Sequence, residues 1–365
     1  MTTTRLAILG ATGSIGRQAL DVARAHPDRL RVVALAADRR REDLEALASE
    51  FGARASVGTE GLRELATADD VDLVLVATPG FAGVEATLAA LGAGKDVALA
   101  NKEVLVVAGH LVRALAGGAG KRVRPVDSEH HALWQCLEGV RPEDVRRVAL
   151  TASGGAFRDR SPAELAQVTP EEALRHPTWK MGPKVTIDSA TLVNKGYEVV
   201  EARWLYGLSY DRIDVVLHAE SVIHALVELT DGSVKAQLAE PDMRLPIQYA
   251  LLWDRALCAA PRLDWQRART LHLGPVDSAK YPCLEIVLGT ARSGDLAAIV
   301  GLSAADEVAV ESFLRGELPF TAIPDLLRRG AELGAREGTG RAPELREIVQ
   351  IDASVRRALV PVLAR

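Results

Sequence analysis

One short segment concentrates groups that could bind an anion and a cation together. It runs from Asp188 to Glu198 and contains Ser189, Asn194 and Lys195. If it forms the first turns of one helix, with Ser189 near the start, Asn194 and Lys195 share a face with Glu198. Amides at the helix start and the lysine would then hold a phosphate, and Glu198 could ligate a metal ion. A solvated polar face of an amphipathic helix explains the same pattern, and this segment alone does not separate the two interpretations.

A second acidic segment lies earlier in the chain, at Asp127, Ser128 and Glu129. It follows residues 122–126, in which basic and small apolar residues alternate as they do at the end of a strand. In a strand, residues two apart project to the same side. We therefore expect the Asp127 and Glu129 carboxylates to converge on a cation, although an acidic loop is the alternative. Glu198 adds a third carboxylate, and no Cys or His pair has zinc spacing. The set therefore favours a hard ion such as Mg²⁺ or Mn²⁺.

A glycine-rich turn close to the N-terminus predicts a dinucleotide site. It lies between the first predicted strand and the first predicted helix, and its residues include Gly10, Thr12, Gly13, Ser14, Ile15 and Gly16. Its Gly-x-x-Gly-x-x-Gly spacing is a variant of the usual fingerprint, in which glycines let the backbone approach a pyrophosphate at a helix N-terminus. A purely structural turn is the alternative, but the position at the start of an alternating α/β pattern favours a dinucleotide.

The residues after the second predicted strand bear on which dinucleotide binds. Asp38 suits a ribose hydroxyl, whereas Arg39, Arg40 and Arg41 suit a 2′-phosphate. These two signals conflict. Because three consecutive arginines lie so close to the glycine-rich turn, we expect NADPH as the cofactor.

A further polar group, Asn101, Lys102 and Glu103, follows another predicted strand. Ligands of parallel sheets bind at the carboxyl ends of the strands, so we expect these residues at the cofactor and Lys102 on its nicotinamide side. The alternative is an asparagine helix cap followed by surface charge.

The composition is that of an ordinary globular protein. Of 365 residues, 48% are hydrophobic and 25% charged, and the net charge of −5 gives no reason to expect nucleic acid or an anionic membrane as a partner. The three cysteines are far apart, as in a reduced cytoplasmic protein. We see no secretion signal at the N-terminus and no apolar run of about 18 residues that would span a membrane.

The pattern of predicted elements belongs to the α/β class and divides the chain into parts. Alternating short apolar strands and amphipathic helices predict an N-terminal Rossmann-like parallel sheet, a dinucleotide-binding domain over residues 1–126. A central α/β catalytic domain is expected over 127–253, with a Pro- and Gly-punctuated loop at 176–183. Asp231 and Gly232 predict a hairpin turn between the strands expected at 222–229 and 234–238. Residues 254–280 read as a linker, and 281–365 as a small C-terminal helical bundle.

A series of short motifs follows in order along the chain. They are the turn at 10–16, Ala-Asn-Lys-Glu at 100–103, Asp-Ser-Glu-His at 127–130, Ser-Gly-Gly at 153–155, His-Pro-Thr-Trp at 176–179, the segment 188–198, Ser-Val-Ile-His at 221–224, Glu-Pro-Asp-Met-Arg at 240–244 and Ser-Ala-Ala-Asp-Glu at 303–307. Taken together, they closely resemble the 1-deoxy-D-xylulose 5-phosphate reductoisomerase family. The resemblance covers essentially the full chain.

The resemblance implies a role for several side chains. One divalent ion would be held by Asp127, Glu129 and Glu198. The substrate phosphate would be bound by Ser153, Ser189, Asn194 and Lys195, and the substrate's other oxygens would be contacted by Ser128. A flap over residues 176–183 that closes on the substrate would contain His176, Trp179 and Met181. We expect the catalytic side chains to be Asp127, Glu129, Glu198, Lys102 and His176.

The chemistry implied by the resemblance is a rearrangement followed by a reduction. The metal would polarise the oxygens of a small phosphorylated sugar while its carbon skeleton breaks and rejoins, and NADPH would reduce the resulting aldehyde. The resemblance also suggests a homodimer. Departures from the family pattern are Asp38, Val104 and the pair Ala219-Glu220.

Two other functions compete with this one. A plain NADP-dependent dehydrogenase of another small phosphorylated substrate would leave the carboxylates structural, and a non-enzymatic NADP sensor would have lost a catalytic carboxylate. All three carboxylates are present, which counts against the sensor. Two histidines, His218 and His224, are interpreted as packed in strands rather than catalytic.

Overall fold

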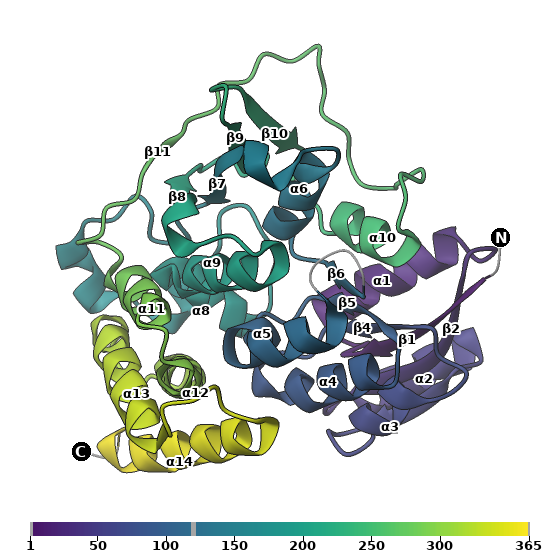
Figure 1. Ribbon diagram of the computed structural model, residues 1–365, viewed down its shortest axis with the longest axis horizontal. Helices are drawn as coiled ribbons and strands as arrows, with labels where there is room; N and C mark the ends of the chain where they lie inside the picture. Colours follow the sequence, from purple (N-terminus) through teal and green to yellow (C-terminus); the bar gives the residue numbers. More distant parts are fainter. Residues whose placement is uncertain (1–2, 118–121, 364–365) are drawn as a thin grey trace.

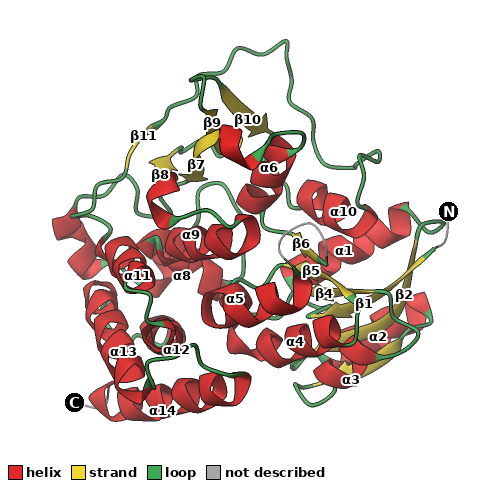
Figure 2. Ribbon diagram, in the orientation of Figure 1, coloured by secondary structure: helices red, strands yellow, loops and turns green. Residues whose placement is uncertain are grey.

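The computed structural model describes residues 3–117 and 122–363. Residues 1–2, 118–121 and 364–365, which belong to the predicted first and last domains, lie outside the described residues. The described elements form a parallel sheet with its helices, a second sheet with its helices, and a group of C-terminal helices (Figures 1 and 2). This arrangement confirms the predicted α/β class and the three kinds of unit.

The first sheet is parallel throughout and has the strand order β3-β2-β1-β4-β5-β6. Its strands are β1 (Thr4–Leu9), β2 (Leu30–Ala37), β3 (Arg54–Val57), β4 (Leu73–Val76), β5 (Asp96–Leu99) and β6 (Val123–Pro125). The order reverses between β1 and β4, and doubly wound sheets bind ligands outside the carboxyl ends of the strands at such a point. The glycine-rich turn follows β1 and therefore lies at this point.

Helices cover both faces of the first sheet. They are α1 (Ser14–Ala25), α2 (Arg41–Phe51), α3 (Leu62–Thr67), α4 (Val84–Gly92) and α5 (Glu103–Ala116), with a 3₁₀ turn at Gly80–Gly83. Alternate residues of β1 are buried on opposite faces: Leu6 and Ile8 belong to one apolar cluster, and Ala7 and Leu9 to another. Burial on both faces explains why the strands read as continuous apolar runs.

The second sheet is mixed, with the order β10-β9-β7-β8-β11. Its strands are β7 (Val145–Ala152), β8 (Ile213–Leu217), β9 (Ile223–Leu229), β10 (Val234–Leu238) and β11 (Gly274–Pro275). β9 and β10 form the predicted hairpin, and Gly232 takes the positive φ of +87° that its turn requires. β11 pairs with β8, so the segment predicted as a plain linker supplies an edge strand.

Helices of the central part connect this sheet to the first one. They are α6 (Ser128–Leu137), α7 (Pro170–Ala173), α8 (Pro183–Thr191), α9 (Val193–Tyr206) and α10 (Arg244–Leu252), with 3₁₀ turns at Pro142–Asp144, Pro162–Gln167 and Tyr210–Arg212. α10 lies beside α1, and Ile247 and Leu251 share an apolar cluster with Leu6 and Ile8 (Figure 1). The last helix of the predicted central domain therefore packs on the first sheet.

The C-terminal part consists of helices, as predicted. They are α11 (Pro282–Arg292), α12 (Leu296–Leu314), α13 (Ile323–Glu337) and α14 (Leu345–Leu363), with a 3₁₀ turn at Phe320–Ala322. α12 and α13 approach closely because glycines face each other: a Cβ atom at Gly301 would lie 2.2 Å from the Gly330 carbonyl oxygen. Among the described residues, no helix has both the length and the apolar character needed to cross a membrane.

Candidate functional site

A cleft at the carboxyl ends of the first sheet's strands contains most of the predicted site. It opens between this sheet, the second sheet and the helices α8 and α9. Its walls include Ser14, Ile15, Lys102, Asp127, Ser128, Glu129, Ser153, Trp179, Lys180, Met181, Ser189, Asn194, Lys195, Glu198, Ser221, His224 and Met243. Segments far apart in the sequence thus meet in one place.

The first acidic segment converges, but not by the predicted strand geometry. β6 ends at Pro125, and Asp127 is the N-cap of α6, where its Oδ1 accepts a hydrogen bond of 3.1 Å from the Glu129 amide. Aspartate is a favoured N-cap, so α6 begins where we expected the strand to end, and the predicted alternation was wrong. Glu129 lies in the first turn of the helix, and one of its carboxylate oxygens lies within 4.8 Å of one from Asp127.

The second acidic segment also differs from the prediction. The expected single helix is two helices, α8 and α9, because buried Leu192 adopts a left-handed backbone with φ of +60° between them. Ser189 therefore lies near the end of α8 rather than at a helix start. Asn194 and Lys195 occupy the first turn of α9, one turn before Glu198, so their predicted common face is present.

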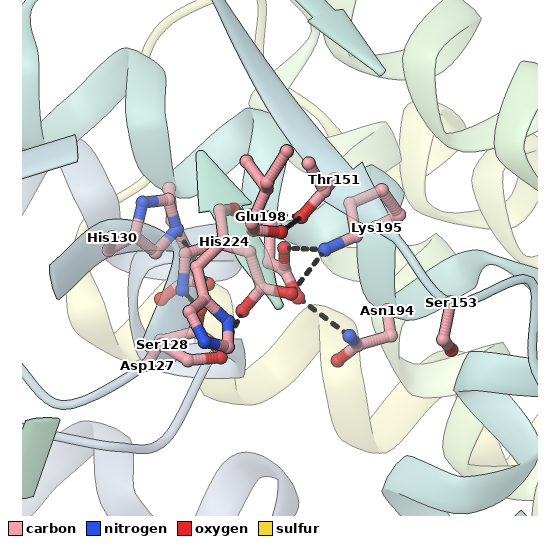
Figure 3. A network of polar contacts seen from close by, with 12 residues as sticks. Asp127, Ser128, His130, Thr151, Ser153, Asn194, Lys195, Glu198 and His224 are labelled. Carbon is pink, nitrogen blue, oxygen red and sulfur yellow. Dashed lines mark hydrogen bonds and ion pairs between the residues drawn. The ribbon is translucent and has the colours of Figure 1, made fainter. Parts of the chain in front are cut away.

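The three carboxylates come together around one point, and Figure 3 labels two of them, Asp127 and Glu198. One oxygen each of Asp127, Glu129 and Glu198 lies within 4.8 Å of the others. Lys195 Nζ is 2.8 Å from Glu129 Oε1 and also contacts Glu198, while Lys102 contacts Asp127 and lies 3.2 Å from Glu198 Oε1. Three negative and two positive side chains thus share a largely buried space.

These lysines determine the charge state of Glu129. Burial raises the pKa of the Glu129 carboxyl, but the Lys195 and Lys102 ammonium groups outweigh burial and lower that pKa to about 2. Glu129 is therefore ionised at neutral pH. A site made only of carboxylate oxygens, with at least one of them ionised, suits a hard divalent cation such as Mg²⁺ or Mn²⁺.

The residues expected at the phosphate line the same cleft. Gly154 and Gly155 have positive φ values, and a Cβ atom at Gly155 would lie 2.5 Å from the Ser189 carbonyl oxygen. Glycine therefore lets the turn after β7 pack directly on the end of α8, which brings Ser153 close to Ser189. Asn194 donates a hydrogen bond of 2.6 Å to Glu198 Oε1, so it also contacts the acidic group.

His176 holds one end of the predicted flap. Its Nδ1 accepts hydrogen bonds of 3.1 and 2.9 Å from the amides of Thr178 and Trp179, and its Nε2 lies 2.9 Å from Ser153 Oγ. Because Nδ1 is an acceptor, the proton of a neutral ring is on Nε2, which donates to Ser153. Burial, with Arg158 nearby, lowers the pKa of His176 to about 4, which keeps the ring neutral.

The glycine-rich turn has the close backbone packing that its spacing predicts. Gly10 has φ of +95°, and a Cβ atom there would lie 2.5 Å from the Ala77 carbonyl oxygen. A Cβ atom at Gly16 would lie 2.3 Å from the Gly10 carbonyl oxygen. Ser14 and Ile15 line the cleft, so the turn and the carboxylates border one space.

The arginines expected at the dinucleotide divide into two environments. Arg40 donates a hydrogen bond of 2.5 Å to the Thr12 carbonyl oxygen, which attaches it to the glycine-rich turn. Arg39 is exposed and forms an ion pair of 3.0 Å with Asp38. Asp38 therefore points at its neighbouring arginine at the surface, and Arg40 is the arginine next to the turn.

Two residues expected at the cofactor also make contacts within the protein. Asn101 is buried, accepts a hydrogen bond of 2.9 Å from the Val104 amide and donates two to backbone carbonyl groups, so it has the helix-capping role given as the alternative. Glu103 is 5% exposed and forms an ion pair of 2.8 Å with Lys184. Neither residue lines the cleft, whereas Lys102 does.

The structure adds residues that sequence reasoning missed. His224 is buried in β9, as interpreted, yet it also lines the cleft, where it interacts with Glu129. Figure 3 shows its ring together with Asp127 and Ser128. Glu201 is 3% exposed and lies 3.3 Å from His130 Nε2 and 3.9 Å from Lys102 Nζ. Glu201 follows Glu198 by three residues on α9, and this helical spacing was a signal for it. No local pattern singles out His224.

Family models match most of the chain. A model described as 1-deoxy-D-xylulose 5-phosphate reductoisomerase matches residues 6–57 and 49–109. Two further models, described as C-terminal domains of the same enzyme, match residues 123–206 and 238–358.

Curated relatives and solved structures agree with these matches. The enzyme named 1-deoxy-D-xylulose 5-phosphate reductoisomerase from Geobacillus kaustophilus is 48% identical, and the match covers 96% of this chain and 97% of the relative. The enzyme of the same name from Thermomicrobium roseum is 50% identical, and the match covers 88% of this chain and 89% of the relative. A crystal structure of DOX-P reductoisomerase in complex with NADPH, fosmidomycin and magnesium superposes with a TM-score of 0.93 at 37% identity, covering 99% of this chain and 98% of the other. The Zymomonas mobilis enzyme in complex with NADPH has a TM-score of 0.87 at 35% identity, covering 99% of both chains.

Proposed function

Because the chain belongs to the 1-deoxy-D-xylulose 5-phosphate reductoisomerase family, we propose that it converts 1-deoxy-D-xylulose 5-phosphate to 2-C-methyl-D-erythritol 4-phosphate. The reaction would use NADPH and one divalent ion, Mg²⁺ or Mn²⁺, as the ligands of the superposed structures suggest. The product is a precursor for isoprenoids made without mevalonate.

A single observation carries the proposal: three carboxylates from two distant segments meet in the cleft that the glycine-rich turn also borders. Lys102 and Lys195 offset part of the repulsion among these carboxylates, but two lysines do not balance three carboxylates, and a dehydrogenase without a metal would have no use for the third. Asp127, Glu129 and Glu198 would hold the ion. Bound there, it would polarise the substrate's oxygens as a Lewis acid.

The other side chains would bind and orient the substrate. Lys195 and Asn194 present a cation and an amide to one side of the cleft, and Ser153 and Ser189 add hydroxyl groups next to them. A phosphate held there lies away from the reacting carbons, so its binding energy can position the substrate and close the segment 176–183. Neutral His176 would keep that segment attached to Ser153. NADPH, held at the glycine-rich turn and Arg40, would supply the hydride.

Steady-state kinetics with purified protein test this proposal. NADPH oxidation is followed by absorbance with 1-deoxy-D-xylulose 5-phosphate as substrate, with and without Mn²⁺, for the wild type and for Glu198→Gln. We expect turnover only with metal, and we expect Glu198→Gln to lower kcat/KM by at least about a hundredfold and to weaken Mn²⁺ binding, because a ligand charge is lost.

The control is Glu332→Gln, an exposed carboxylate on α13, which should behave as the wild type. Metal-independent oxidation of NADPH with another phosphorylated substrate would instead favour the plain dehydrogenase. NADPH binding with no turnover of any substrate would favour the sensor.

Three further expectations belong to the proposal. They are the domain boundaries at residues 126, 253 and 280, a homodimer, and a cytoplasmic location. Sedimentation of the purified chain tests the dimer directly.

A further inference from the structure

A buried ion cluster joins all three units of the chain at one lysine. Lys184 Nζ lies 2.8 Å from Glu103 Oε1, 2.6 Å from Asp188 Oδ2 and 2.7 Å from Asp306 Oδ2. Glu103 opens α5 beside the first sheet, Lys184 and Asp188 belong to α8, and Asp306 lies in the middle of α12. The Tyr197 hydroxyl donates a hydrogen bond of 3.1 Å to Asp306 Oδ2.

The ion pairs with Glu103, Asp188 and Asp306 restrain the Lys184 side chain. The Asp306 side chain is fully buried, and the Lys184 side chain is 17% exposed. Burying a carboxylate is costly unless a cation pairs with it, and here three carboxylates contact the same ammonium group. Burial lowers the pKa of Lys184, but Asp188, Asp306 and Glu103 outweigh it and raise that pKa well above its usual value. Lys184 therefore stays charged and fixed.

Lys184 directly follows the segment 177–183, which covers the cleft. Trp179 and Met181 of this segment line the cleft, and α8 begins at Pro183. At its other end, His176 is attached to Ser153 of the second sheet. Across the described part of the chain, the side chains of residues 177–183 form no hydrogen bond or ion pair. The segment is therefore held at two points, His176 and Lys184.

We propose that Asp306 is a positioning residue for the closing segment, because it holds Lys184 and with it the second attachment point of residues 177–183. The C-terminal helices would then take part in closing the cleft, although none of the described residues after Met243 lines it. Asp306 does not line the cleft and does not contact the proposed metal ligands Asp127, Glu129 and Glu198. The inference rests on the proposed function, since it assigns the segment to substrate closure.

The test is Asp306→Asn, which keeps the shape of the side chain and removes its charge. We expect trypsin to cleave after Lys180 at least about fivefold faster than in the wild type, because the segment loses an attachment. We also expect KM for the sugar phosphate to rise and kcat to fall, by about fivefold or more, with KM for NADPH unchanged. Glu311→Gln, an exposed change on the same helix, should match the wild type in both measurements.

Two results would overturn the inference. One is an Asp306→Asn enzyme that matches Glu311→Gln in cleavage after Lys180 and in KM. The other is cleavage that accelerates equally at all sites with unchanged KM, which would mean general destabilisation only. Cleavage does not require turnover, so an inactive wild type would refute the proposed function while the trypsin result still decides this inference.

A measurement on the wild type covers the case in which Asp306→Asn does not fold. Hydrogen exchange should be slow for amides 186–188 of α8, which follow Lys184, and fast for amides 180–182, which lie between the two attachment points. Equally fast exchange in both ranges would contradict the attachment by Lys184.

Discussion

At the scale of single residues, neighbouring groups determine the charge of two side chains in the cleft, Glu129 and His176. Glu129 is held ionised by Lys195 and Lys102. His176 is held neutral, because burial disfavours its charged form and its Nδ1 accepts from two backbone amides. Protonation at Nδ1 would break both of these hydrogen bonds.

The state of His176 leads to a prediction about pH. Its pKa in the folded protein is about 4, against 6.5 for an ordinary histidine, so the unfolded chain binds the extra proton between these values. The stability that His176 contributes is therefore present above about pH 6.5 and is lost as the pH falls to about 4. In NMR spectra of histidine-labelled protein, we expect the His176 signal to stay constant from pH 8 to about 5.5.

The His176 signal is identified by its absence in His176→Gln. Exposed His272 serves as the internal comparison, because its side chain is 74% exposed. A midpoint for His176 near pH 6.5 would show that its ring is not held by the amides of the segment.

At the scale of the elements, the junction of β1 and α1 depends on glycine at two positions. In Gly16→Ala, the added Cβ atom would lie 2.3 Å from the Gly10 carbonyl oxygen and 2.6 Å from the Ala11 Cα atom. Because both contacts are with backbone, the turn must move. We expect a loss of about 1 to 3 kcal/mol in the free energy of unfolding and at least about tenfold weaker NADPH binding, measured by denaturation and fluorescence titration.

Gly289→Ala is the matched control for Gly16→Ala. Gly289 also lies inside a helix, α11, but a Cβ atom there would have no neighbour within 4 Å. Alanine is the better helix former, so this change should raise the free energy of unfolding by up to about 1 kcal/mol and leave NADPH binding unchanged. If both variants lost NADPH binding equally, the close packing of the turn would not be the cause.

Elements with a strong repeating pattern could be predicted, and those without one could not. The parallel strands, the Asp231-Gly232 hairpin and the four C-terminal helices follow from apolar runs and turn residues. Short β3 and α3 and the helix α10 carry little periodicity and were missed. The break between α8 and α9 at Leu192 could not be predicted, because leucine rarely adopts a left-handed backbone.

For the candidate site, chemistry was easier to predict than contacts. Three carboxylates and a nearby lysine were identified from residue type and spacing, and they do converge. Asn101 and Glu103 were expected at the cofactor because they follow a strand end, and the structure adds contacts with distant segments that sequence reasoning did not predict. Such contacts depend on the fold of the whole chain, so local sequence does not contain them.

At the scale of the whole molecule, one apolar cluster contains side chains from all three units, while the strands of the second sheet pack in a separate cluster. A continuous cluster of buried side chains extends from β1 through α5 and α9 to α12 and α14. The helices of different units pack closely. A Cβ atom at Gly109 of α5 would lie 2.2 Å from the Trp204 ring on α9. A Cβ atom at Gly196 of α9 would lie 2.8 Å from the Val287 side chain on α11. Glu307 of α12 also accepts a hydrogen bond of 3.0 Å from the Phe81 amide.

Such a shared core predicts that the units unfold together, and the positions of the tryptophans make this testable. All five tryptophans lie between residues 134 and 265, and only Trp253, whose ring contacts Arg124 of β6, packs on the sheet that carries the glycine-rich turn, so the experiment uses Trp253→Phe. In a urea titration, we expect tryptophan fluorescence and far-UV circular dichroism to report the same single transition. NADPH at a hundredfold excess over its Kd should stabilise both signals by about 2.7 kcal/mol, although it would bind beside β1. If the units were independent, NADPH would shift part of the dichroism transition and leave the fluorescence transition where it was. That outcome would contradict a common core, because stabilisation of one unit would then not reach the tryptophans of another.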